Sequence, residues 1–137
     1  MKTTLNHFLF VICLIFMGIN SSEAQQANAK IQEVYGDKYQ EISTNDPERI
    51  KLLSDLLENR IKIVEVSSVG EDKYPKLSSV SLLNKYNPNL TRDVAFDMNT
   101  FNPLKYNLNF FSTKTEVYRI DNTDYLLVIQ PQTINKD

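Results

Sequence analysis

Cysteine, histidine and tryptophan are almost missing from this chain of 137 residues, which has one Cys, one His and no Trp. Cys13 lies within an apolar run near the N-terminus, and His7 comes just before that run. A Ser-His-Asp triad, thiol chemistry and the usual zinc sites all need these residue types. Their scarcity excludes those chemistries from the rest of the chain, and a single Cys cannot form a disulfide within it.

Glycine and excess basic charge are also scarce. Of the three glycines, only Gly36 and Gly70 lie beyond the N-terminal apolar run, so no Gly-rich phosphate loop can be built. The formal net charge is −2 and no basic stripe is present, which argues against a nucleic-acid partner. We therefore expect no cofactor, no metal site and no nucleic-acid binding.

The N-terminus does contain a recognisable signal. A basic start is followed by an apolar run from Phe8 to Ile19 and then by a small, polar exit, which are the three parts of a secretory signal peptide. The run is shorter than the ~20 residues of a membrane span, so no permanent anchor is expected. Ser22 and Ala24 suit a cleavage site, and cleavage after Ala24 predicts a periplasmic or secreted protein. An uncleaved N-terminal anchor is the alternative.

The remaining chain has the size of one domain, which buries roughly 65% of its unfolded surface. Residues 25–45 are polar and are predicted to be loosely ordered, with a short helix or strand as the alternative. Residues 46–132 are predicted to form a single α+β domain, followed by a polar tail at 133–137. The clearest element is a helix over 47–59, because Asp46 is a good N-cap, Pro47 suits the first turn and an apolar stripe follows.

The rest of the domain favours strands, and we expect an antiparallel-rich sheet of about five strands packed with that one main helix. Residues 61–67 are β-branched, and residues 93–98 and 104–110 alternate between apolar and polar. Two further strands flank the turn at 121–124 as a hairpin, and the second of them, 125–130, should be central because it is apolar on both faces. The structure of 68–92 is left open as irregular or short extended chain.

The most distinctive stretch is "FNPLKYNLNFF" at 101–111, rich in aromatic residues and asparagine. Its period of two places Leu104, Tyr106, Leu108 and Phe110 on the core face and leaves the alternate residues outside. Tyrosine and asparagine are adaptable contact residues, and loops often carry binding groups. The candidate partner or ligand surface consists of Lys105, Asn107, Asn109 and Phe111, together with Tyr86, Asn87 and Asn89.

A carboxylate pair is the remaining route to catalysis. Asp93 and Asp97 share a face of the predicted strand, but four residues at ~3.3 Å each separate them by about 13 Å. Glycosidase pairs lie ~5–5.5 or ~6.5–9.5 Å apart, so this local pair is too wide. No catalytic residues are therefore assigned.

Between Tyr74 and Gln132, three motifs resemble a group of uncharacterised small exported proteins of Bacteroidota: "YPKLSSVSLLNKYNPNL", "FNPLKYNLNFF" and "YRIDNTDYLLVIQPQ". The resemblance implies an envelope or secreted location in a Gram-negative cell, and it implies no activity. We expect a non-catalytic interaction or structural component of the envelope, with an envelope protein as its partner. The alternatives are a small-ligand or glycan-binding module and, third, a carboxylate-dependent hydrolase.

Overall fold

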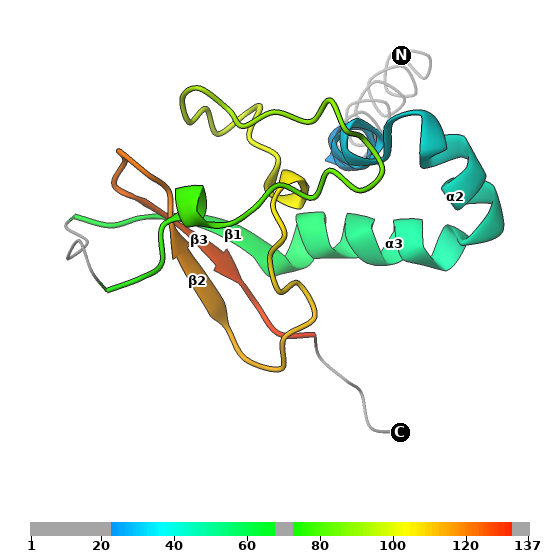
Figure 1. Ribbon diagram of the computed structural model, residues 1–137. Coiled ribbons are helices and arrows are strands. Elements are labelled where there is room, and N and C mark those ends of the chain that lie inside the picture. Colours follow the sequence, from blue (N-terminus) through cyan, green and yellow to red (C-terminus); the bar gives the residue numbers. More distant parts are fainter. Residues whose placement is uncertain (1–22, 68–72, 133–137) are drawn as a thin grey trace, which may run out of the picture.

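The computed structural model describes residues 23–67 and 73–132, so the predicted signal run and the polar tail lie outside the described residues. Helices gather at one end of the molecule and a small sheet at the other, and an irregular segment crosses above both (Figure 1). The α+β class is confirmed. In the described residues the sheet has three strands, not five, and more than one helix is present.

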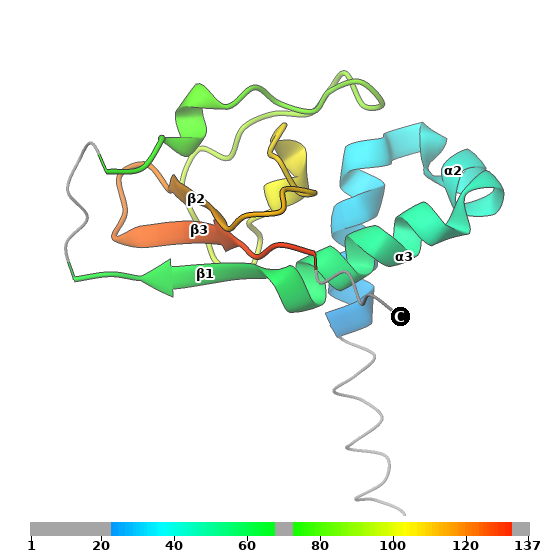
Figure 2. The same ribbon diagram turned by 90° about the horizontal axis from the view of Figure 1, so that it is seen from below.

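The N-terminal segment is the first correction. Residues 23–35 are helical and lead through a single 3-10 turn, Gly36–Lys38, into helix α2, Tyr39–Asn45. The helix at 23–35 crosses α3, Pro47–Asp55, at its inner side (Figures 1 and 2). Ala27, Ile31 and Val34 are buried, because these positions lie three to four residues apart and share one helix face. Prediction of a loosely ordered 25–45 was therefore wrong.

Helix α3 begins where the sequence predicted. The Asp46 side chain accepts a hydrogen bond from the backbone N–H of Arg49, and Pro47 stands in the first turn. The last turn widens into a π-helical turn, Leu56–Arg60, which runs directly into strand β1, Ile61–Glu65. Leu53 and Leu56 point from this helix into the core.

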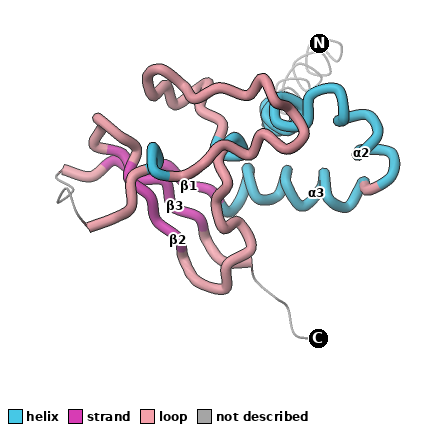
Figure 3. The backbone as a smooth tube through the Cα atoms, viewed as in Figure 1, coloured by secondary structure: helices cyan, strands magenta, loops and turns pink. Residues whose placement is uncertain are grey.

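The sheet has the order β1-β3-β2 and is antiparallel throughout. Strand β2, Glu116–Arg119, and strand β3, Tyr125–Ile129, form the predicted hairpin, and Asn122 takes the left-handed conformation in its turn. Strand β3 is central, as its apolar sequence predicted, and Leu127 is completely buried. Figure 3 shows these three strands as the short magenta segments of the backbone.

The segment 73–111 is irregular apart from two 3-10 turns, Leu77–Ser79 and Pro103–Lys105 (Figure 3). The predicted strands at 93–98 and 104–110 are both absent from it. Val94 and Met98, two of the apolar residues in the alternating pattern at 93–98, are exposed. Residues 104–110 keep the predicted burial of every second side chain, but they are an extended chain with one isolated bridge, Leu82 to Tyr106, in place of a ladder.

One hydrophobic core joins the helices, the sheet and this irregular segment. The helices contribute Ile31 and Leu56, the sheet contributes Leu127, and the irregular segment contributes Phe101 and Leu104. The segment is thus part of the core although it lacks regular structure, and it fixes the surfaces described next.

Candidate functional site

The predicted loop surface at Tyr86–Asn89 is largely used to hold the fold together. Tyr86 packs on Tyr35, with ring centroids 4.9 Å apart. Asn87 donates through Nδ2 to the backbone oxygen of Glu33 at 2.7 Å, and its Oδ1 accepts from the backbone N–H of Asn89 at 3.1 Å. Asn89 itself is exposed. The loop is therefore docked on the helix at 23–35, which leaves little of Tyr86 and Asn87 for a partner.

The second predicted group divides in two. Lys105, expected on the outer face, is only 4% exposed, which corrects that part of the prediction. Its Nζ lies 2.7 Å from Asp93 Oδ1 and 3.6 Å from Glu33 Oε1. Lys105 lies at the end of the Pro103–Lys105 turn, and this turn directs the side chain inward to the helix at 23–35.

Asn107, Asn109 and Phe111 do lie on the surface, as predicted. The backbone N–H of Asn107 donates to the carbonyl oxygen of Ser81 at 2.9 Å, which anchors the chain and leaves the side chain outside. Phe111 is 58% exposed, which is high for a phenylalanine next to a core residue such as Phe110. Phe111 also borders a hollow in the surface.

That hollow is an apolar groove of about 290 Å³ between α3 and the end of the irregular segment. We call it the apolar groove. Its lining includes five buried residues, while Leu52 and Phe111 are exposed; the buried ones are Val34, Tyr35, Leu53, Leu104 and Phe110. Leu52 is 40% exposed and lies outside the apolar stripe of this helix, which consists of Ile50, Leu53, Leu56 and Leu57. A leucine outside the stripe was the available signal for this surface, and the sequence prediction did not use it.

A stack of one cation and two rings borders the groove. The Arg49 guanidinium lies 5.5 Å from the ring centroid of Tyr35 and 5.6 Å from that of Tyr86, within the range of cation–π contacts. Partial burial opposes the charged form of Arg49, but its two tyrosine neighbours outweigh this effect and the pKa of Arg49 is raised. Burial has the opposite effect on the Tyr35 hydroxyl, because its charged form is the deprotonated one, and it raises the pKa of Tyr35. Arg49 is thus a fixed positive charge, and it is held against the wall of the groove by the two rings.

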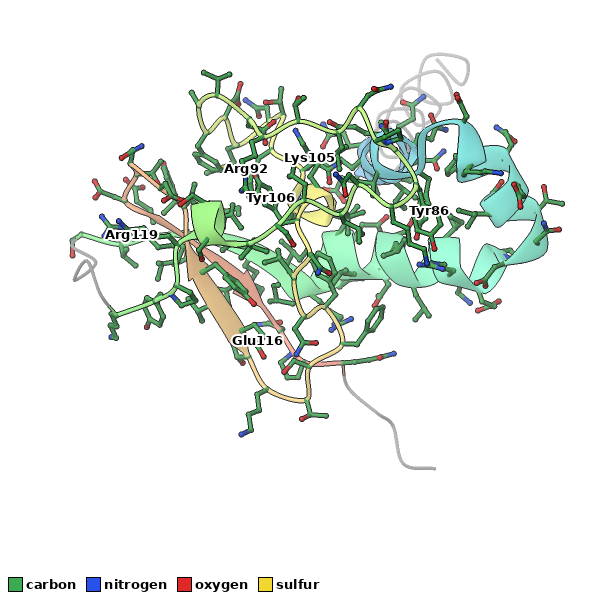
Figure 4. The ribbon with its side chains drawn as sticks, in the orientation of Figure 1. Tyr86, Arg92, Lys105, Tyr106, Glu116 and Arg119 are labelled. Atoms are coloured by element: carbon green, nitrogen blue, oxygen red, sulfur yellow. The ribbon has the colours of Figure 1, made fainter. Side chains whose placement is uncertain are left out.

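A second cluster lies on the other side of the irregular segment, where Figure 4 labels Arg92, Lys105 and Tyr106 close together. The Arg92 guanidinium lies 5.6 Å from the Tyr106 ring and donates to the carbonyl oxygens of Leu77 and Val80. Burial of Lys105 lowers its pKa, but hydrogen bonding and charge attraction from Asp93 prevail and the net shift is upward. Burial raises the pKa of Tyr106, and the Asp93 charge adds to this shift.

Comparison with protein-family models, curated proteins and solved structures gives no match for this chain. Within residues 23–67 and 73–132, no helix combines the length and the apolar character that are needed to cross a membrane. Across the same ranges, no three His, Cys, Asp or Glu side chains converge as a metal site would require. The function is therefore inferred from the surfaces of the protein.

Proposed function

We propose that this protein is an exported, non-catalytic interaction component of the bacterial envelope, and that it contacts its partner through the apolar groove. The observation that carries the proposal is the pair of large apolar side chains, Leu52 and Phe111, which are exposed at the edge of an apolar hollow. An apolar centre with charged groups around it is typical of the energetic centre of a protein–protein interface. Asp46, Glu48 and Arg49 supply such a charged border.

The size of the groove is compatible with anchoring side chains of a protein partner. Small-molecule sites usually enclose roughly 300–1,000 Å³, and the groove, at about 290 Å³, is at the lower end of that range. One or two anchoring side chains of a partner would fill it. Binding energy at interfaces is concentrated in a few such anchors.

The hydrolase alternative gains less support. A carboxylate-dependent hydrolase needs a carboxylic acid whose pKa is raised, so that it can protonate the leaving group. Burial of Asp121 would raise its pKa, but two hydrogen bonds from Ser78 outweigh burial and lower it. Asp93 is engaged by Lys105 at 2.7 Å. The lowered pKa of Asp121 does not suit a general acid, and Asp93 is taken up by its ion pair with Lys105.

Site-specific photo-crosslinking in an envelope fraction tests the proposal. We expect benzoylphenylalanine at position 111, and separately at position 52, to give the same discrete crosslinked product. Met98 is the matched control, since it is an apolar side chain with 53% exposure that does not line the groove. The proposal is refuted if positions 111 and 52 give no product, or if position 98 gives the same one. Phe111→Ser should abolish capture of that partner, whereas Met98→Ser should leave it unchanged.

A further inference from the structure

We propose that a second hollow, between the 93–96 loop and the hairpin turn, binds a neutral carbohydrate. This cavity has a volume of about 410 Å³, which lies within the usual range for small-molecule sites. Its buried wall includes Leu77, Phe101 and Tyr106, and Asp93 and Asp121 contribute carboxylates. This cavity shares no lining residue with the apolar groove, so the two proposals can be tested independently.

The polar groups of this cavity are already held in place. Asp121 accepts hydrogen bonds from the backbone N–H of Ser78 at 2.9 Å and from its hydroxyl at 2.6 Å. Asp93 is held by Lys105 at 2.7 Å. A carboxylate has about four acceptor positions, so both groups can accept further hydrogen bonds from a ligand. Because their positions are fixed beforehand, a ligand loses little free energy in ordering them.

The charges determine what kind of ligand is suitable. The two carboxylates that line the cavity repel anions, and they accept hydrogen bonds but donate none. Among the neighbouring cations, Lys105 is shared between Asp93 and Glu33, and Arg92 is bonded to two carbonyl oxygens. Lys76 lies close enough to Asp121 to help lower its pKa, after burial and the Ser78 hydrogen bonds. The carboxylates that line the cavity disfavour an anion, and the cations next to them disfavour a second positive charge, so the site suits a neutral molecule that donates several hydrogen bonds.

Apolar surface faces these acceptors within the same cavity. Phe96 is half-buried and packs against Phe101 at 5.3 Å and against Tyr125 at 5.2 Å, so its ring is fixed. Val94 is fully exposed at the edge of the cavity. A sugar ring carries hydroxyl donors around its edge and apolar C–H groups on its faces, and hydroxyl–carboxylate bonds are of the stronger, charge-assisted kind. A carbohydrate therefore matches both walls.

Tyr106 links this inference to the sequence. It belongs to the aromatic and asparagine-rich stretch that suggested a ligand surface, yet its ring lies on the opposite side of the chain from the exposed Asn107 and Asn109. The aspartates that complete the cavity come from two separate loops, the 93–96 loop and the turn between β2 and β3. Their proximity depends on the docking of the irregular segment.

Titration of the isotopically labelled protein with monosaccharides, followed through its amide resonances, tests the inference. The neutral probes are glucose, galactose, mannose and N-acetylglucosamine, while glucuronate and glucosamine bring a negative and a positive charge on a similar ring. At least one neutral sugar should shift the resonances of residues 93–96 and 121–123 at millimolar concentration. Glucuronate should bind at least about ten-fold more weakly, because the carboxylates repel it. Absence of shifts with every neutral sugar, or equal binding of glucuronate, would overturn the inference, as would a clear preference for glucosamine.

Two variants locate the site. Asp121→Asn should weaken sugar binding about ten-fold, because it replaces charge-assisted hydrogen bonds by neutral ones. Asp124→Asn removes the same charge from the same turn, outside the cavity, and should leave binding unchanged. Ala95→Trp fills the cavity from an exposed position without altering the Ser78–Asp121 bonds, and it should abolish binding in a folded protein. Unchanged affinity in both Asp121→Asn and Ala95→Trp would place the sugar elsewhere.

Discussion

The helices and sheet are held in one way and the irregular segment at 73–111 in another. In the first region, repeated backbone hydrogen bonds set the chain path, and apolar side chains such as Ile31 and Leu127 join the elements. In the second, individual polar side chains fix the path. Asn102 donates to the carbonyl of Lys30 at 2.8 Å and accepts from the backbone N–H of Leu104.

This difference teaches where each region is sensitive. A regular element loses little when one exposed polar side chain is removed, because its backbone ladder remains. The irregular segment has few such ladders, so each buried polar anchor positions several residues. Both hollows are bordered by this segment, and their shapes therefore depend on those anchors.

The largest effect should come from the apolar contacts of the N-terminal helix. Ile31→Ala removes a fully buried side chain and should lower the free energy of unfolding by about 3 kcal/mol. Denaturant unfolding measures this change. The neighbouring Gln32 is exposed, and Gln32→Ala should have almost no effect. A small effect of Ile31→Ala would mean that residues 23–35 do not belong to the core in solution.

The next largest effect should come from Asn102, the most buried polar residue of the irregular segment. Asn102→Ala should cost about 2 kcal/mol, because it leaves the N–H of Leu104 without its partner and removes the bonds to Lys30 and Glu33 of the helix at 23–35. Asn107→Ala is the matched control, since that side chain is exposed five residues further on. If the two variants unfold alike, anchoring by single polar side chains is not what distinguishes this segment.

Lys105 should show a smaller effect that depends on pH. Lys105→Met should cost about 1–2 kcal/mol near neutral pH, less than a fully buried pair, because Glu33 and Asp93 remain 45% and 31% exposed. The folded pKa of Lys105 is raised above its ordinary 10.5, so this stabilisation is complete below that value and is lost as the pH rises through the folded pKa. The difference between wild type and variant should therefore shrink above about pH 10.5.

A surface ion pair provides the control for Lys105. Lys38 contacts Glu41 at 2.9 Å with both side chains exposed, and Lys38→Met should cause no measurable change at neutral pH. Burial also raises the pKa values of Tyr35 and Tyr106, so the whole protein should lose stability at alkaline pH. The Tyr35 part of this background is common to wild type and Lys105→Met. The Lys105 charge lowers the pKa of Tyr106, so the Tyr106 part belongs to the measured difference. A difference that stays constant with pH would contradict the assignment to Lys105.

The smallest effect should come from Asp121, whose carboxylate is only partly buried. Its pKa is lowered below the ordinary 3.8, so its contribution is present above that pH and is lost as the pH falls through the folded value. After allowance for solvent screening, Asp121→Asn should cost a few tenths of a kcal/mol at neutral pH. Thermal unfolding at neutral pH and near pH 3 measures this, with Asp124→Asn as the control. A larger loss of stability in Asp121→Asn near pH 3 than at neutral pH would contradict the expected sign.

Prediction from the sequence succeeded where the signals were local. The Asp46–Pro47 start of α3, strand β1 and the β2–β3 hairpin follow from capping, β-branching and turn composition within a few residues. It failed for 25–45, because the buried face of that helix carries only a few apolar residues among many polar ones. The stripe of Ala27, Ile31 and Val34 acquires its meaning only from the partners it packs against.

Alternation was informative about burial but not about secondary structure. Leu104, Tyr106 and Phe110 are buried as their period of two predicted, yet within the described residues they form one isolated bridge, from Tyr106 to Leu82, and no ladder. An extended chain docked by side chains has the same period. At 93–98 the same pattern failed even for burial, since Val94 is fully exposed. In the candidate site, Phe111 was correctly predicted to be exposed. The inward direction of Lys105 could not be predicted in the same way, because it depends on Asp93 and on Glu33, which is distant in sequence.

Arg60 connects segments of the chain that are distant in sequence. Its guanidinium donates to the backbone oxygen of Phe110 at 2.6 Å and to that of Gln130 at 3.0 Å. The end of α3, the wall of the apolar groove and the last residues of the sheet are therefore fastened at one point. A tensile force applied at Gln130 passes through this fastening to Phe110, so stretching the C-terminal end should distort the groove before it unwinds α3. Force spectroscopy from that end would detect this order as loss of binding to the proposed partner ahead of helix unfolding.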